Sequence, residues 1–128
     1  MLLRIFIVLF VIFCIGALIY YLFPPVKVCG RSMYPTYQDD TILLTTRCFL
    51  KYVPGEVYIY NRKEDGDDRV VVKRLKDVIT QEGQTYLYFE GDNPEESYDS
   101  RYYGFVSSKN LVCKVINQRR KVNYDSCN

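Results

Sequence analysis

The sequence predicts a mainly β protein in which a single N-terminal transmembrane helix is followed by a compact antiparallel β domain. Residues 5–23 form an apolar run without a charged residue. From residue 27 onward, short runs of β-branched and aromatic residues recur between turn signals, and no long helical period is present. A chain of 128 residues whose first fifth is apolar has room for one further small domain. We therefore expect a membrane anchor at 1–26 and a β-rich domain at 27–128.

The apolar run at 5–23 predicts a membrane-spanning helix. Its 19 residues extend about 28 Å as an α-helix, which matches the hydrocarbon core of a bilayer. A cleaved signal peptide is the alternative, but its apolar core is shorter and ends in small residues. Here the run ends in aromatic residues that suit a membrane interface, including Tyr20 and Tyr21, and prolines at 24–25 stop the helix. We therefore interpret it as an uncleaved anchor.

Five runs after the anchor predict strands. They are TILLTT at 41–46, EVYIY at 56–60, RVVVKRL at 69–75, TYLYF at 85–89 and LVCKVI at 111–116. We expect the polar stretch NRKEDGDD at 61–68 to form a long solvated hairpin loop, and residues 81–84 to turn the next hairpin. Hairpin connections of this kind predict an antiparallel sheet.

Composition argues against several classes of site. The net charge of +2 is too weak to indicate a nucleic-acid partner. The chain has no histidine, which removes Ser-His-Asp and Cys-His catalytic pairs and His-ligated zinc. The five cysteines, at 14, 29, 48, 113 and 127, contain no C-x-x-C pair and indicate no metal site. One disulfide among the four outside the apolar run stays open, although we expect each to be a free thiol.

Without histidine, the economical hydrolytic pair is a serine nucleophile with a neutral, desolvated lysine as base. Ser32 lies in GRSMYPT, between a glycine and a proline, a few residues after the anchor. Lys73 lies in VVVKRL, where three consecutive valines predict a strand that is buried on at least one face. Taken singly, Ser32 is better explained as an ordinary turn residue and Lys73 as a strand lysine that points to water.

A third segment changes this balance. Alone, GDNPEESYDSRYYG at 91–104 predicts a polar surface turn. Together with it, the chain resembles the type I signal peptidases (leader peptidases), a family of Ser-Lys dyad serine proteases. Residues 32–36 resemble the nucleophile motif of that family, and Lys73 with Arg74 resembles its base motif. The last motif of the family is matched at Gly91, Asp92, Asn93, Ser97, Asp99, Ser100, Arg101 and Gly104.

The resemblance implies catalysis that requires no metal and no cofactor. Ser32 would be the nucleophile, and its backbone N–H would hold the oxyanion. Lys73 would be the general base, and burial would have to lower its pKa for it to be neutral at about pH 8. Ser97 would hydrogen-bond to Lys73 and orient it, while Asp99 and Arg101 would pair and brace the loop.

Two features depart from the pattern of the family. Members commonly continue after Lys-Arg with Gly-x-Pro-Gly-Asp, whereas this chain continues with LKDV at 75–78. Some relatives have a side-chain hydroxyl donor two residues before the nucleophile, where this chain has Gly30. Oxyanion binding would then depend on backbone N–H groups.

The resemblance also implies a substrate class and a location. The enzyme would remove signal peptides from secretory preproteins, which bind in extended form with small side chains before the cut. The catalytic domain would lie on the extracytoplasmic side of the cell membrane. Charge alone does not orient the helix, because Arg4 and the α-amino group are nearly matched by Lys27 and Arg31. Two alternatives stay open: a processing peptidase for a narrow client, and an inactive membrane-tethered β domain that binds peptides.

Overall fold

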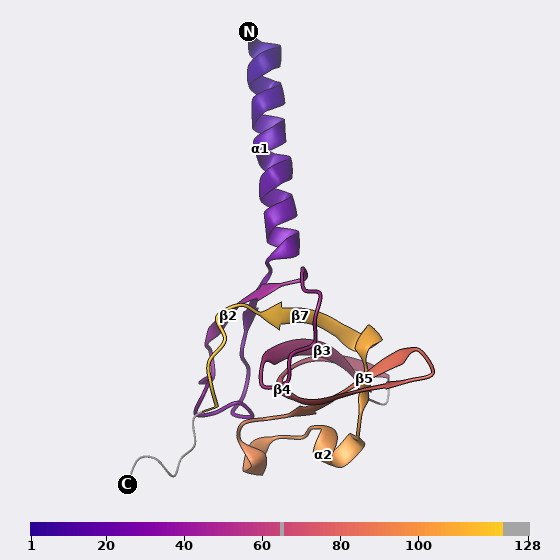
Figure 1. Ribbon diagram of the computed structural model, residues 1–128. Coiled ribbons are helices and arrows are strands. Elements are labelled where there is room, and N and C mark those ends of the chain that lie inside the picture. The colour runs from indigo at the N-terminus through magenta and orange to yellow at the C-terminus, as the bar shows by residue number, and fades with distance from the viewer. Residues whose placement is uncertain (65, 122–128) are drawn as a thin grey trace.

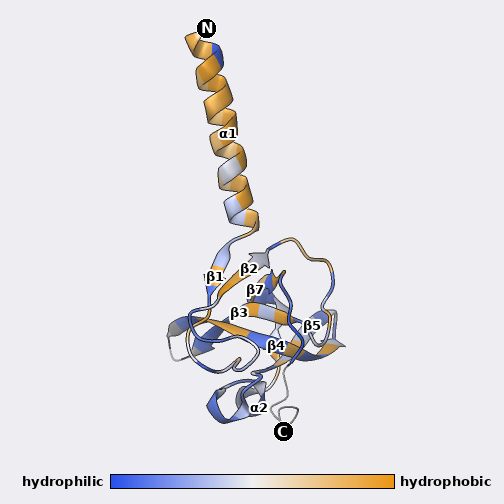
Figure 2. Ribbon diagram, turned by 90° about the vertical axis from the view of Figure 1, so that its left-hand side faces the viewer, coloured by the Kyte–Doolittle hydropathy of each residue, from blue (hydrophilic) through white to orange (hydrophobic). Residues whose placement is uncertain are grey.

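The computed structural model describes residues 1–64 and 66–121. Its first element is α1 (Leu2–Leu22), which projects away from a β domain (Figure 1). No residue of α1 is buried, and the helix is long and apolar enough to cross a membrane. Figure 2 shows the same contrast, with a nearly uniform apolar helix above a domain of mixed polarity. A helix able to span a membrane is thus present where the sequence predicts one, and it ends one residue before the predicted end.

The β domain is a seven-stranded sheet in the order β1-β2-β7-β3-β4-β5-β6, and each described strand pair is antiparallel. The mainly β fold class is therefore confirmed. The strands are β1 (Pro25–Lys27), β2 (Ile42–Thr46), β3 (Val57–Glu64), β4 (Asp67–Gln81), β5 (Gln84–Glu90), β6 (Val106–Ser107) and β7 (Leu111–Val115). Short helical turns follow β5 and β6: η1 (Pro94–Glu96), α2 (Ser100–Tyr103) and η2 (Ser108–Asn110).

The two predicted hairpins have different outcomes. The turn at 81–84 is confirmed, because Gln81 pairs with Gln84 and the two residues between them have positive φ, as a tight two-residue hairpin requires. The long loop expected at 61–68 is wrong. β3 continues to Glu64 and β4 begins at Asp67, so most of this charged stretch is paired strand. Strand pairing is made by backbone groups, and charged side chains on a solvent-facing hairpin do not prevent it.

Two apolar clusters form the core. One contains Val28, Met33, Tyr37, Leu43, Val57, Ile59, Cys113 and Val115, of which the first three belong to the loop that joins β1 to β2. The other contains Tyr58, Tyr60, Leu75, Leu87 and Phe89, from the central strands β3, β4 and β5. Three segments that are distant in sequence meet beside this core, namely the β1–β2 loop, β4 and the loop after β5, and hydrogen bonds from Lys73 and Asn93 to Ser32 join them.

The described cysteines are free thiols. Cys14, Cys29 and Cys48 are exposed, and Cys113 is buried in the core. Cys127 lies outside the described residues.

Candidate active site

Ser32 lies in the loop between β1 and β2, and buried neighbours hold this loop. Met33 and Tyr37 are fully buried in the first core cluster, and the N–H of Tyr37 donates to the carbonyl of Met33 at 2.9 Å. The side chain that precedes them is only half-buried. The packing of its neighbours thus fixes the loop and leaves Ser32 partly exposed.

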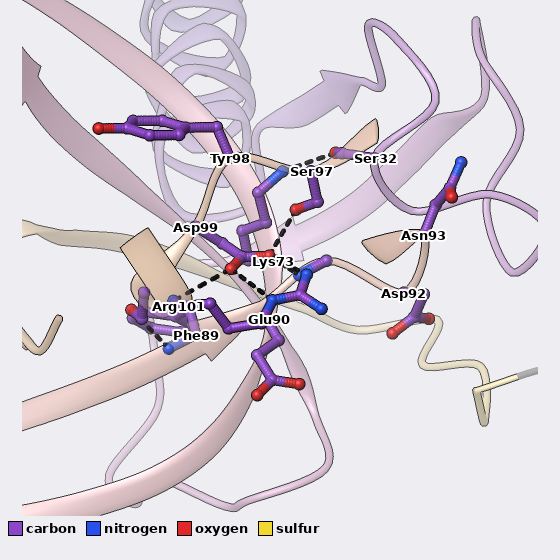
Figure 3. A network of polar contacts seen from close by, with 12 residues as sticks. Ser32, Lys73, Phe89, Glu90, Asp92, Asn93, Ser97, Tyr98, Asp99 and Arg101 are labelled. Atoms are coloured by element: carbon purple, nitrogen blue, oxygen red, sulfur yellow. Dashed lines mark hydrogen bonds and ion pairs between the residues drawn. The ribbon is translucent and has the colours of Figure 1, made fainter. Parts of the chain in front are cut away.

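Lys73 lies on β4 opposite Tyr58 and reaches Ser32 (Figure 3). Its Nζ donates to Ser32 Oγ at 2.6 Å. The residue is only 4% exposed, and this burial lowers the pKa of Lys73 to about 8, since desolvation penalises the ammonium form. The negative charge of Asp99 opposes the effect of burial, while the guanidinium groups of Arg62 and Arg101 reinforce it.

Asp99 is the centre of a hydrogen-bond network in the loop after β5. Its carboxylate is fully buried and accepts from the N–H of Gly91 at 2.7 Å and from the Ser97 hydroxyl at 2.6 Å. Arg101 adds donors from Nε at 2.9 Å and from Nη2 at 2.5 Å. Burial alone would raise the pKa of Asp99, but these donors outweigh it and lower the pKa to about 2. The ion pair expected between Asp99 and Arg101 is present.

The Ser97 side chain is used differently from the expectation. Its hydroxyl donates to Asp99, and within the described residues no hydrogen bond joins it to Lys73. Ser97 is therefore linked to the lysine through the carboxylate that opposes the lowering of the Lys73 pKa.

Gly91 lies where no side chain fits. A Cβ at this position would be 2.6 Å from the backbone oxygen of Ser32 and 2.5 Å from the Cβ of Ser97. Distances below 3 Å are not found for real Cβ atoms, so a larger residue would displace the Ser32 backbone or the Ser97 side chain. Glycine allows this close approach because it has no side chain.

Asn93 connects the same loop to the serine backbone. Its backbone N–H donates to the carbonyl of Ser32 at 2.9 Å, and its Nδ2 donates to the carbonyl of Arg31 at 3.0 Å. The same amide donates to Glu96, which also pairs with Arg31. Asn93 was visible in the sequence only as a motif position, without a role.

A buried ion pair joins β4 to this loop. Arg74 donates to both carboxylate oxygens of Asp92, from Nε at 2.8 Å and from Nη2 at 2.7 Å, and Nη1 donates to the carbonyl of Gly55 at 2.6 Å. The Arg74 and Asp92 side chains are only 5% and 1% exposed. The residue next to Lys73 therefore fixes the loop against the strand, a role that the sequence alone did not indicate.

Together these contacts place a half-buried serine hydroxyl beside a buried amine whose pKa is lowered to about 8. A neutral amine at hydrogen-bond distance from a hydroxyl can accept its proton, which is the arrangement that nucleophilic catalysis needs. In the described part of the chain, no group of three His, Cys, Asp or Glu residues is placed to hold a metal ion.

The chain matches a known protein family. The family model described as "Signal peptidase, peptidase S26" matches residues 51–118, which is just over half of the chain. The matched region includes Lys73 and the whole loop from 91 to 104, and it begins after Ser32. No curated protein matches the chain.

Proposed function

Because the chain belongs to the signal peptidase S26 family, we propose that it is a membrane-anchored serine endopeptidase with Ser32 as nucleophile and Lys73 as general base. One observation carries the proposal: a buried lysine with a pKa of about 8 lies 2.6 Å from a half-buried serine hydroxyl. Residues 1–26 serve as the anchor and residues 27–128 as the protease domain. This boundary falls within the short strand β1.

The chemistry needs the neutral form of Lys73. Its Nζ takes the hydroxyl proton while Ser32 Oγ bonds to the carbonyl carbon of the scissile peptide. The ammonium then gives this proton to the leaving nitrogen as the C–N bond breaks, which leaves an acyl-enzyme. Water attacks the ester as Lys73 takes a proton from it, and this proton passes to Ser32 Oγ as the ester C–O bond breaks. The product leaves as a carboxylic acid and then ionises in water.

The developing negative charge on the substrate oxygen requires a donor close to Ser32. The backbone N–H of Ser32 is the candidate, and within the described chain it donates to no other group. Gly30 offers no side-chain donor two residues earlier, so we expect the oxyanion to be held by backbone groups.

Ser97, Asp99 and Arg101 support the dyad rather than react. Asp99 and Arg101 fix the loop through their ion pair, and Gly91 and Asn93 transmit its position to the Ser32 backbone. We propose that Ser97 acts on Lys73 through Asp99, whose negative charge keeps the pKa of Lys73 from falling further.

The substrate we propose is a secretory preprotein whose signal peptide is removed. β1 is an edge strand of the sheet and leads directly into the Ser32 loop, so an extended peptide can pair with it by main-chain hydrogen bonds. Small side chains before the cut fit this mode of binding, and we place the domain on the extracytoplasmic side of the cell membrane.

Incubation of the detergent-solubilised full chain with a panel of preproteins tests the proposal, with each product mapped by mass spectrometry. We expect cleavage after small residues. Ser32→Ala should lower the cleavage rate by at least about 1,000-fold, since nucleophile and base act together and neither works without the other. Cleavage of a single precursor would favour the narrow-client alternative. Binding without cleavage would favour the inactive β domain and contradict the proposal.

A further inference from the structure

The loop that follows β2, residues 47–53, lies at the end of the domain that faces α1 (Figures 1 and 2). The backbone N–H of Arg47 donates to the carbonyl of Leu22 at 2.9 Å. Its Nε donates to the carbonyl of Tyr21 at 2.9 Å, and its guanidinium lies 4.9 Å from the centre of the Tyr21 ring. Leu22 is the last residue of α1, so this loop begins where the apolar helix ends.

The loop is held in place on both sides of its centre. Phe49 packs edge-on against the ring of Tyr58, with ring centres 5.8 Å apart, and Tyr58 is fully buried in the core. The Tyr58 hydroxyl accepts from the N–H of Val53 at 2.9 Å and donates to the carbonyl of Lys51 at 3.3 Å. The direction of the side chains between these contacts is therefore set by the fold.

Apart from Phe49, the apolar and aromatic side chains of this loop are exposed. Leu50 is fully exposed, and Tyr52 and Val53 are each more than a third exposed. Ile116, at the end of β7, is half exposed beside them, and a cavity of about 580 Å³ separates the loop from β7. A lone exposed leucine means little in itself, but this one lies on a loop that contacts with Tyr58 hold in place, next to the end of an apolar helix.

The charges of the loop are of one sign. Residues 47–53 contain Arg47 and Lys51 and no acidic residue. Basic side chains close to a bilayer are attracted to anionic headgroups, and aromatic residues such as Tyr21 and Tyr52 favour the same interfacial layer. The loop thus combines apolar, aromatic and basic side chains at the level where α1 ends.

We propose that residues 47–53 form a second membrane contact, in which Leu50 enters the boundary between headgroups and acyl chains and Lys51 binds anionic headgroups. The occupant of this surface is the bilayer that holds α1. A helix alone leaves the domain free to tilt, whereas two contacts fix its tilt and hence the position of Ser32 relative to the membrane. This proposal does not depend on the protease chemistry.

Tryptophan fluorescence tests the contact directly, because the chain has no tryptophan. The full chain carrying Leu50→Trp is inserted into vesicles of phosphatidylcholine and phosphatidylglycerol with brominated acyl chains. The control is Tyr102→Trp, an exposed position in α2 at the far end of the domain (Figure 1). We expect severalfold stronger quenching in Leu50→Trp than in the control. Equal quenching would overturn the proposal, and so would a blue-shifted emission that lipid does not quench, since it indicates contact with a second protein.

A charge reversal tests the headgroup contact in the same background. Lys51→Glu should weaken the quenching severalfold in vesicles that contain phosphatidylglycerol and leave it unchanged in pure phosphatidylcholine. Lys63→Glu, an exposed position on β3, is the matched control and should change neither. An effect of Lys51→Glu no larger than that of Lys63→Glu would contradict the role given to Lys51.

Discussion

The buried amine of Lys73 is unfavourable for folding, and in the proposed mechanism it serves as the general base. Its pKa falls from 10.5 to about 8 through desolvation. As the pH falls from about 10.5 to 8, the unfolded chain gains a proton at this lysine while the folded chain does not, so stability is lost over this window. Below pH 8 the loss is constant, at about 3 kcal/mol as an order of magnitude, since each pKa unit corresponds to about 1.4 kcal/mol.

Lys73→Met should therefore abolish cleavage and stabilise the fold. We expect about 2–3 kcal/mol of added stability at neutral pH, because the variant has no buried group to desolvate as a cation. The gain should disappear above about pH 10.5, where the lysine of both states is neutral. Urea unfolding across this pH range measures the effect. Lys76→Met, at a more exposed lysine on the same strand, is the control and should show no such pH dependence. A destabilised Lys73→Met at every pH would show that the contact with Ser32 outweighs desolvation.

Substitutions in the loop around Asp99 should affect the cleavage rate and the stability of the fold to different extents. Ser97→Ala removes one of several donors to Asp99, so we expect it to slow cleavage more than it lowers the melting temperature. Arg101→Met leaves the buried Asp99 charge without its ion pair and should cost up to about 3–5 kcal/mol. Thermal melts beside single-turnover rates distinguish the two. An early melt with a normal rate per folded molecule in Ser97→Ala would reduce Ser97 to a scaffold residue.

Low pH should destabilise the fold by protonating the carboxylate of Asp99. The pKa of Asp99 is lowered from 3.8 to about 2 in the fold, so its contribution to stability is present above pH 4 and is lost as the pH falls towards 2. Asp99→Asn cannot titrate at this position, and its unfolding should be less dependent on pH in this window. Identical acid profiles for Asp99→Asn and the unchanged protein would contradict this assignment.

Among the elements, the apolar helix and the five longer strands could be predicted because each has a strong local pattern. The elements that sequence analysis missed are short: β1 and β6 have three and two residues, and α2 has four. Elements of this length have no periodicity of their own and form because longer neighbours pair with them. The strand pairing at 61–68 was missed for a different reason. The polar composition of this segment indicated a loop, whereas β3 and β4 are paired through most of it.

In the candidate site, the two central residues could be predicted from the sequence, and the contacts that position them could not. Ser32 and Lys73 could be singled out from the missing histidines and the motif order, and the structure brings the two within hydrogen-bond distance. The contacts that position them could not be predicted, because they depend on strand register and loop packing. Asn93 against Ser32 and Arg74 against Asp92 each join segments whose proximity is set by the sheet.

The Arg74–Asp92 pair should be a strong link between β4 and the loop after β5. Arg74→Met leaves a buried carboxylate unpaired, and we expect a loss of about 3–5 kcal/mol in the free energy of unfolding. Arg74→Met combined with Asp92→Leu should lose less than the sum of the single variants, since no charge is then left unpaired. The control is Lys27→Met, which breaks an ion pair whose side chains are 59% and 75% exposed and should cost less than about 1 kcal/mol. Additive losses in urea unfolding would mean that the pair is not coupled.

At the scale of the whole molecule, the helix and the domain have separate functions. No residue of α1 is buried, so the core clusters are built from the β domain alone. In the proposed function α1 adds location, because a tethered enzyme meets membrane-bound substrates at a high effective concentration. The side of the membrane on which the domain lies then decides which proteins it meets.

Labelling of the exposed thiols can show on which side of the membrane the domain lies. Cys29 and Cys48 are exposed on the domain, whereas Cys113 is buried and Cys14 lies within the apolar helix. If the domain is extracytoplasmic, a maleimide that cannot cross membranes should label the protein in intact bacterial spheroplasts, without permeabilisation. Cys29→Ser combined with Cys48→Ser is the control, and the labelling that it loses reports these two positions alone. Labelling of Cys29 and Cys48 that appears only after the membrane is opened would place the domain in the cytoplasm, where its substrates could not be proteins that have already crossed the membrane.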